Sequence, residues 1–169
     1  GQVNLNKTLT LVNVTISGNS VTGFGSGGGI NISATVGGSK LHTINCTIAN
    51  NSAHSALGGG GIAAAGFNPA ETVLQNTIIA NNTLPNLINL TPPGLNWPVT
   101  FTSQGGNLTD DSGSGYLTHS TDQINKNPLL AVLEQYGGQT PTHALLPGSP
   151  AINSGVMTFA PGADQRGVT

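Results

Sequence analysis

The feature of this sequence that most constrains its fold is an internal repeat, and its period of about 32 residues lies in the range of known repeat architectures. An eight-residue motif occurs three times at a nearly constant offset: Asn13-Val14-Thr15-Ile16-Ser17-Gly18-Asn19-Ser20, Asn45-Cys46-Thr47-Ile48-Ala49-Asn50-Asn51-Ser52 and Asn76-Thr77-Ile78-Ile79-Ala80-Asn81-Asn82-Thr83. A glycine motif keeps the same step, with a looser third copy: Gly27-Gly28-Gly29-Ile30, Gly59-Gly60-Gly61-Ile62 and Gly105-Gly106-Asn107-Leu108. In such architectures each unit needs its neighbours to bury a core.

Within each unit, apolar residues alternate with Thr, Asn and Ser over short stretches such as residues 9–17, and turn residues follow. This two-residue period is typical of β-strands, and the i, i+3, i+4 spacing of helices is missing. A propeller blade needs roughly 40 residues and helical repeats need helices, so both of these repeat architectures fit the sequence less well than a β-solenoid. The sequence therefore predicts an all-β protein, a right-handed parallel β-helix (solenoid) of about three coils of 31–32 residues with an irregular C-terminal tail.

Stacked coils place equivalent side chains above one another at the spacing of neighbouring strands, about 4.8 Å. We expect two aliphatic columns, Ile16-Ile48-Ile79 and Ile30-Ile62-Leu108. We also expect two ladders of hydrogen-bonded amides at the corners, Asn13-Asn45-Asn76 and Asn19-Asn51-Asn82, since Asn tolerates the left-handed backbone that corners require.

Only 6% of the residues are charged, against roughly 25% in an ordinary soluble domain. In an in-register stack a charged side chain would lie over the equivalent charged side chain of the next coil and repel it, so uncharged polar residues are favoured. Four Lys and Arg residues cannot neutralise a row of phosphates, which argues against nucleic acid as a partner. The 36% hydrophobic content argues against disorder, and no apolar run is long enough for a membrane span.

Two regions are expected in the chain. Residues 1–109 should form the coils, interrupted by a Pro-rich insertion at 84–100, and residues 110–169 should form a tail or cap module that packs on the solenoid. Seven of the ten charged residues follow Leu108, outside the regular repeats. The chain begins at Gly1 rather than Met, which suggests a processed product or a fragment.

The tail carries a specific set of motifs: Asn127-Pro128-Leu129-Leu130, the run from Gly137 to Gly155, and Asp164-Gln165-Arg166-Gly167. With these motifs and its repeats, the chain resembles the bacterial choice-of-anchor Q surface proteins, whose coils are similar to polymorphic outer-membrane protein repeats. The resemblance implies a right-handed parallel β-helix at the cell surface or outside the cell. Family members often carry two cysteines in the tail region, and this chain has neither.

Parallel β-helices include enzymes that cleave polysaccharides with paired carboxylates or a Ca²⁺ site, yet Glu71 is the only acidic residue before Asp110. We therefore expect no catalytic residues. A Ca²⁺ site at Asp110, Asp111 and Asp122 is the one cofactor possibility, although adjacent Asp residues in a Ser/Gly loop more often form a solvated turn.

Several single residues receive structural predictions. Cys46 has no second thiol and should be a core filler. The four histidines share no ligand spacing, and a structural hydrogen bond is expected for His143. Asp164 and Arg166 should form a pin that holds the C-terminus. Asn89 lies in an Asn-x-Thr sequence and is a possible glycosylation site.

These features favour a non-enzymatic structural protein of the cell surface that self-associates through its solenoid ends, by stacking or strand exchange into a fibre. The strand-like segment Gly1–Leu5, which no capping helix precedes, motivates this expectation. The alternatives are an adhesin module that binds surface glycans through Trp97, Tyr116 and Phe101, and a polysaccharide-degrading enzyme.

Overall fold

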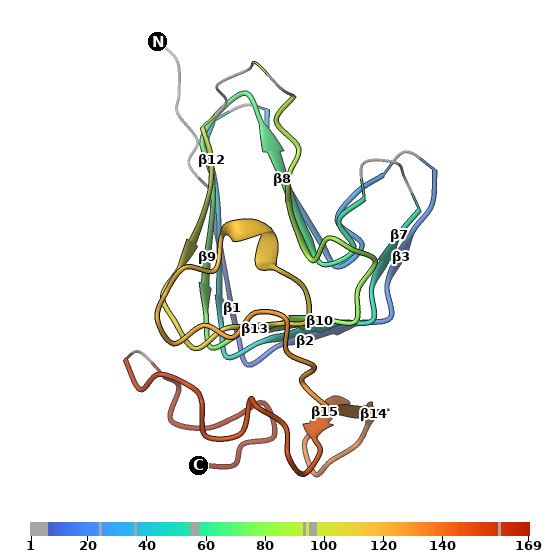
Figure 1. The fold of residues 1–169 in the computed structure, drawn as a ribbon, viewed down its shortest axis with the longest axis vertical. Helices are drawn as coiled ribbons and strands as arrows, with labels where there is room; N and C mark the ends of the chain where they lie inside the picture. Colours follow the sequence, from blue (N-terminus) through green and yellow to red (C-terminus); the bar gives the residue numbers. More distant parts are fainter. Residues whose placement is uncertain are drawn as a thin grey trace.

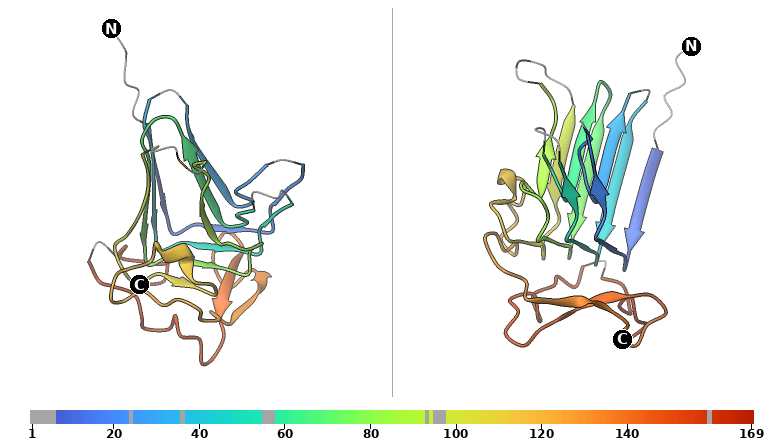
Figure 2. Two further views of the ribbon diagram at one scale, coloured as in Figure 1. Left: turned by 45° about the horizontal axis from the view of Figure 1, so that its top comes forward. Right: turned by 90° about the vertical axis from the view of Figure 1, so that its right-hand side faces the viewer.

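The computed structural model describes residues 7–23, 25–35, 37–54, 58–92, 94, 98–158 and 160–169. Among them β-strands dominate, and the only helical element is the 3₁₀ turn η1 (Gly113–Gly115). The strands of the coils run parallel to their neighbours, stacked along one axis (Figures 1 and 2). The predicted all-β solenoid of about three coils is confirmed.

Three parallel sheets form the walls of the solenoid (Figure 1). The first sheet contains β1 (Lys7–Val12), β5 (Ser39–Ile44), β9 (Ala70–Gln75) and β12 (Val99–Ser103). The second contains β2 (Thr15–Ser17), β6 (Thr47–Ala49), β10 (Ile78–Ala80) and β13 (Leu108–Thr109). The third contains β4 (Ile30–Ala34), β8 (Ile62–Gly66) and β11 (Leu87–Asn89). A short side pair, β3 (Ser20–Val21) with β7 (Ser52–Ala53), projects from the first two coils.

The coils stack in register, as the repeat predicts. Ile16 pairs with Ile48, and Ile48 with Ile79, so that these side chains form one column. Ile48 and Ile79 are fully buried in the core between the sheets. The aliphatic column is therefore a direct product of the constant repeat period.

The second predicted column is wrong in its third member. Ile30 lies beside Ile62, but the next residue in the stack is Leu87, whereas Leu108 pairs with Ile78 in the second sheet. The third coil omits the side excursion that β3 and β7 make in the first two coils. Leu87 consequently follows Ile62 at a shorter interval along the chain than Ile62 follows Ile30.

The described parts of the Pro-rich segment 84–100, which was expected to be an insertion, contribute strands to the coils. They contain β11, which pairs with β8, and the first two residues of β12, which pair with β9. A cis peptide bond precedes Pro85 in the shortened turn.

The glycine motifs allow neighbouring coils to approach closely where the side excursion returns to the third sheet. A Cβ atom on Gly60 would lie 2.6 Å from the Thr83 carbonyl oxygen and 2.7 Å from that of Asn51. Real Cβ atoms essentially never come this close to other heavy atoms, so only glycine fits between these coils.

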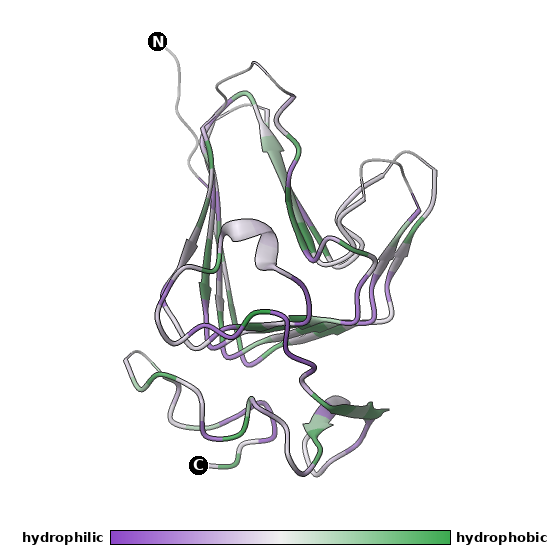
Figure 3. Cartoon of the chain, viewed as in Figure 1, coloured by the Kyte–Doolittle hydropathy of each residue, from purple (hydrophilic) through white to green (hydrophobic). Residues whose placement is uncertain are grey.

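After β13 the chain forms two further parts, which we call the cap segment (residues 110–126) and the tail (residues 127–169). The tail runs along the outer side of the second sheet and contains the antiparallel hairpin of β14 (Leu130–Glu134) and β15 (Thr142–Leu145) (Figure 2). Hydrophobic residues concentrate on the coil strands and on this hairpin (Figure 3). Among the described residues, no helix has the length and apolar character needed to cross a membrane.

Candidate functional site

The first corner of each coil is made by an asparagine with a left-handed backbone. Asn13, Asn45 and Asn76 have φ values of 55°, 54° and 46°. Asn45 Nδ2 donates to Asn13 Oδ1 over 2.6 Å, but no bond joins Asn45 to Asn76 among the contacts of the described residues. Instead, the Asn76 amide bonds to the main chain of Val156 in the tail. This ladder therefore has one internal rung, and its ends bind the tail.

The second ladder is continuous through the coils. The Asn51 Oδ1 atom accepts from the Asn19 side chain over 2.9 Å, and Asn82 Oδ1 accepts from Asn51 over 3.0 Å. The same two oxygens also accept the main-chain N–H groups of Asn19 and Asn51. Asn51 and Asn82 are buried, so the ladder satisfies polar groups that water does not reach.

The left-handed backbone at this second corner lies one residue earlier than the ladder. Gly18, Asn50 and Asn81 have positive φ values of 73°, 58° and 57°. The motif thus separates two tasks: the first residue turns the chain, and the following asparagine connects the coils. The prediction that the ladder asparagines Asn19, Asn51 and Asn82 also adopt the left-handed corner conformation is wrong.

Beyond Asn82 the ladder has one more amide, because Asn82 Nδ2 donates to Asn86 Oδ1 over 2.9 Å, and carboxylates follow. Asp110 accepts hydrogen bonds from the Asn81 N–H and the Asn86 side chain, and Asp111 accepts one from the Asn86 N–H. Asp122 accepts from the N–H and side chain of Asn107. A further coil would offer its own acceptors to these donors, so the acidic residues act as substitutes for that coil.

These contacts also bear on the predicted cation site. The carboxylates of Asp110, Asp111 and Asp122 lie over different donors and are used as hydrogen-bond acceptors. In the part of the chain that the structure describes, no group of three or more His, Cys, Asp or Glu side chains is placed to hold a metal ion. The acidic residues of this segment are best described as structural.

Asp111 shows the electrostatic effect of this role. Burial by itself would raise the pKa of its carboxyl group, because desolvation disfavours the charged form. Hydrogen bonds from the Asn86 N–H, the Thr109 hydroxyl and the Gly113 N–H outweigh burial, and the pKa lies below its ordinary value. The hydrogen bonds at this end therefore favour the ionised form of Asp111.

The cap segment also plugs the core. Tyr116 stacks on Phe101 with ring centroids 4.6 Å apart, and Leu117 is buried in the core cluster. Residues 107–109 and 123–126 exchange main-chain hydrogen bonds, which adds a rudimentary strand beside β13. Of the aromatic residues proposed as a glycan platform, Phe101 and Tyr116 thus face each other at this end, and Trp97 lies outside the described residues.

The opposite end of the core is open among the described residues. Leu9 in the first coil is 55% exposed, whereas its stacked equivalent Leu41 is 2% exposed. Ile30 is half-buried, and Ile62 above it is fully buried. A groove of about 250 Å³ opens between β1 and β4 and is lined by Leu9, Ile30, Ile32 and Leu41, with Lys7 and Lys40 also on its wall. The strand-like segment Gly1–Leu5 lies outside the described residues.

The tail docks on the second sheet through polar contacts. Asn13 Nδ2 donates to the Ala163 carbonyl over 2.8 Å, and the Thr15 hydroxyl donates to Gln165 Oε1 over 2.7 Å. Gln75 Nε2 donates to the Thr158 carbonyl. Asn13 and Thr15 match residues of the next coil, Asn45 and Thr47, so nothing in the sequence marks them as tail contacts. Gln75 does carry a signal, because it is a buried polar residue where the stacked positions of the other coils hold Ile44 and Val12.

His143 makes the structural hydrogen bonds expected of it. Its Nδ1 atom lies 2.7 Å from the Ala131 carbonyl, which only accepts, so Nδ1 carries the proton. Nε2 then accepts from the Ser17 hydroxyl over 2.8 Å. The imidazole thereby joins the hairpin, at its irregular register, to the end of β2.

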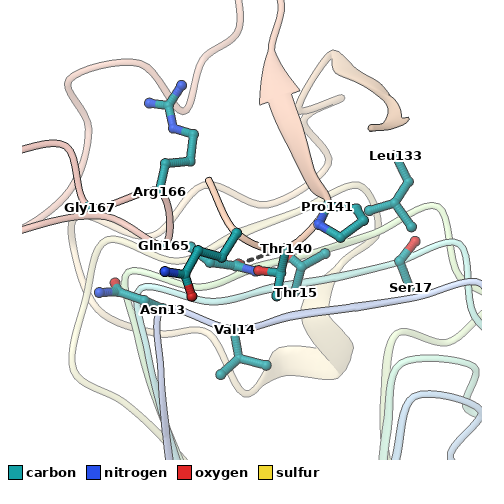
Figure 4. A pocket seen from close by; sticks show the side chains of 11 residues that line it. Asn13, Val14, Thr15, Ser17, Leu133, Thr140, Pro141, Gln165, Arg166 and Gly167 are labelled. Atoms are coloured by element: carbon teal, nitrogen blue, oxygen red, sulfur yellow. Dashed lines mark hydrogen bonds between the residues drawn. The ribbon is translucent and has the colours of Figure 1, made fainter. Parts of the chain in front are cut away.

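Two grooves remain between the tail and the second sheet. The larger, of about 720 Å³, has Ser17 at one end and Arg166 at the other (Figure 4). The smaller, of about 360 Å³, includes Asn45, Cys46 and His143. Cys46 itself is buried, and burial raises the pKa of its thiol, so it remains a protonated filler.

The Asp164–Arg166 pair is local. Arg166 contacts the Asp164 carboxylate over 2.6 Å, and that carboxylate also accepts the N–H groups of Arg166 and Val168. Both side chains are about one-third exposed. The pair shapes the turn at 164–168, while Asn13 and Thr15 connect this part of the tail to the solenoid.

Asn89, the possible glycosylation site, lies in β11 and is half-buried. Its Oδ1 accepts the N–H of Thr91, the third residue of the same Asn-x-Thr sequence, over 2.8 Å. The acceptor amide is therefore already part of a local turn.

No protein-family model, curated protein or solved structure matches this chain.

Proposed function

We propose that the protein is a non-enzymatic structural component, located at the cell surface or outside the cell, that associates through the first-coil end of its β-solenoid. One observation carries this proposal: the core is plugged at the β13 end and, among the described residues, open at the β1 end, where Leu9 is 55% exposed. Exposed core columns and unpaired strand edges recruit other chains.

The resemblance to choice-of-anchor Q surface proteins supports the location. The low charge supports the structural role, because like charges in one column would repel each other. Lys40 and Glu71, which are stacked neighbours in the first sheet, have opposite charges and form an ion pair over 3.1 Å. The acidic residues that could serve catalysis instead accept hydrogen bonds at the closed end. No contact among the described residues favours the glycan-binding alternative.

Sedimentation velocity over a wide range of protein concentration tests the proposal. We expect reversible association, which Leu9→Glu weakens because it places a carboxylate at the mouth of the core. Thr102→Glu, on the exposed face of β12 near the closed end, is the matched control and should leave association unchanged. A monomer at every concentration, with no assemblies in electron micrographs, contradicts the proposal.

A further inference from the structure

The first-coil end carries a strand, β1, whose main-chain groups on one side have no hydrogen-bond partner among the residues that the structure describes. In β1, the N–H groups of Lys7 and Asn13 point to β5, where they donate to Gly38 and Ile44. Successive residues of a parallel strand alternate in direction, so the main-chain groups of Thr8, Thr10 and Val12 point away from β5. β1 is the outer strand of the first sheet in the described part of the chain.

The closed end does not complement this surface. The exposed face of the closed end, beyond β13, carries Ser112, Ser114 and Gly115 of the cap segment. In a head-to-tail stack these small polar residues would meet the apolar groove between β1 and β4 of the next copy. In a head-to-tail stack, Lys7 would continue the inward column Lys7-Ser39-Ala70-Val99 and fall on Val99. Burying an ammonium group against a valine without a partner is costly. Head-to-tail growth is therefore disfavoured.

A second copy of the same end does complement it. If two β1 strands pair antiparallel with Thr10 on the twofold axis, Thr8, Thr10 and Val12 face Val12, Thr10 and Thr8 of the second copy. The main-chain N–H and C=O groups of these three residues are the ones that point away from β5, toward the second copy. Leu9 then faces Leu11 of the second copy on the core side.

This register also keeps the Lys7 ammonium group of each copy away from the apolar residues of the core. Each Lys7 falls beyond Val12 of the second copy, next to its polar corner at Asn13. Shifting the register by two residues would instead put Lys7 opposite Leu11 on the core side. A shift of one residue would pair inward with outward side chains.

We infer that two copies of the chain pair head to head through β1, with Thr10 at the twofold axis, and form a closed dimer rather than a fibre. This inference rests on the proposed function, since it names the partner of the same open end. The first sheets of the two copies then form one continuous sheet of eight strands, four from each copy.

Cysteine crosslinking tests the arrangement in the intact chain, in a Cys46→Val background that copies Val14 of the first coil. Thr10 and Thr102 are exposed in the same outward column, separated by three strand spacings, or about 14 Å. In the dimer, two Thr10→Cys residues would lie about 5.5 Å apart, which permits a disulfide. Thr102→Cys residues would be far apart.

We expect oxidised Thr10→Cys to yield crosslinked dimers with twice the mass of the single chain, and Thr102→Cys to stay uncrosslinked. We also expect Leu9→Glu to raise the dimer dissociation constant about tenfold or more, because it buries a carboxylate opposite Leu11. Crosslinks between Thr10→Cys and Thr102→Cys in a mixture, with assemblies larger than dimers, would overturn the pairing but keep the proposed function. A strict monomer would refute both.

Discussion

The side-chain amide of Asn76 binds the main chain of Val156 in the way that one β-strand binds another. Its Oδ1 accepts the Val156 N–H over 2.8 Å, and its Nδ2 donates to the Val156 carbonyl over 2.9 Å. Eighty residues separate the two positions in sequence. A corner residue of the third coil thus holds the tail against the solenoid.

Replacing Asn76 by glycine should loosen the tail without disturbing the corner, because glycine tolerates the φ of 46°. Loss of both hydrogen bonds should cost about 1–3 kcal/mol and accelerate amide exchange near Val156. Hydrogen exchange measured by mass spectrometry on peptides covering 150–158 reports the effect. Asn45→Gly has the same backbone conformation, and its amide bonds within the solenoid, so it should leave exchange in these peptides unchanged.

Removal of the central rung of the second ladder should destabilise the whole stack. Asn51→Ala deprives Asn19 of its acceptor and leaves the Ile16 carbonyl without this donor, at a cost of about 2–4 kcal/mol. Urea unfolding followed by circular dichroism measures the change. Asn19→Ala, at the exposed end of the same ladder, should cost about 1 kcal/mol or less; equal losses would contradict the ladder.

Gly60 should not tolerate a methyl group. Alanine there would clash with the main chain of Thr83 and Asn51, and the coils would have to move apart, which should cost about 3 kcal/mol or more. Gly162, with open space around it and no unusual φ, serves as the control, and Gly162→Ala should change stability by less than about 0.5 kcal/mol. The thermal midpoints of the two variants compare them directly.

Acid should weaken the closed end through Asp111. Its pKa is lowered in the folded state, so its stabilising contribution is present above the unfolded value near 3.9 and is lost as the pH falls through the folded value. Asp111→Asn should cost about 1–3 kcal/mol at neutral pH and flatten the dependence of stability on pH below about 4. Urea unfolding at a series of pH values measures both effects.

Asp164→Asn should destabilise the protein less than Asp111→Asn does. The pKa of Asp164 is also lowered: desolvation raises it, but the hydrogen bonds from Arg166 and Val168 and the charge of Arg166 together outweigh that effect. Because the pair is partly exposed, its loss should cost less than about 1 kcal/mol. An acid-unfolding profile that responds more to Asp164→Asn than to Asp111→Asn would contradict the importance of the cap segment.

The repeat was sufficient to predict the first two coils and the register of β2, β6 and β10 in the second sheet, because equivalent residues recur at a constant offset. Leu87 could not be found in this way. The third coil omits the side excursion, so no glycine motif precedes Leu87, and Gly105–Leu108 imitates the motif at a different place in the coil. A turn that shortens one repeat leaves no periodic signal.

The contacts at the ends of the stack were not predictable for a different reason. In the sequence, Asp110, Asp111 and Asp122 have the pattern of a solvated loop. Their partners are distant in sequence: in the structure they accept the N–H groups of Asn81, Asn86 and Asn107, respectively. Likewise, Ser17 and His143 are 126 residues apart, and no local pattern joins them.

The contrast between exposed Leu9 and buried Leu41 indicates that local stability increases from the first coil toward the third. In a stack whose units contact only their neighbours, stability is roughly a sum of unit and interface contributions, and the unit with one interface opens first. Amide exchange should therefore be fastest in β1, slower in β5 and slowest in β9, and uniform exchange across the three would contradict it. A partner bound at β1 would slow the opening of every coil behind it.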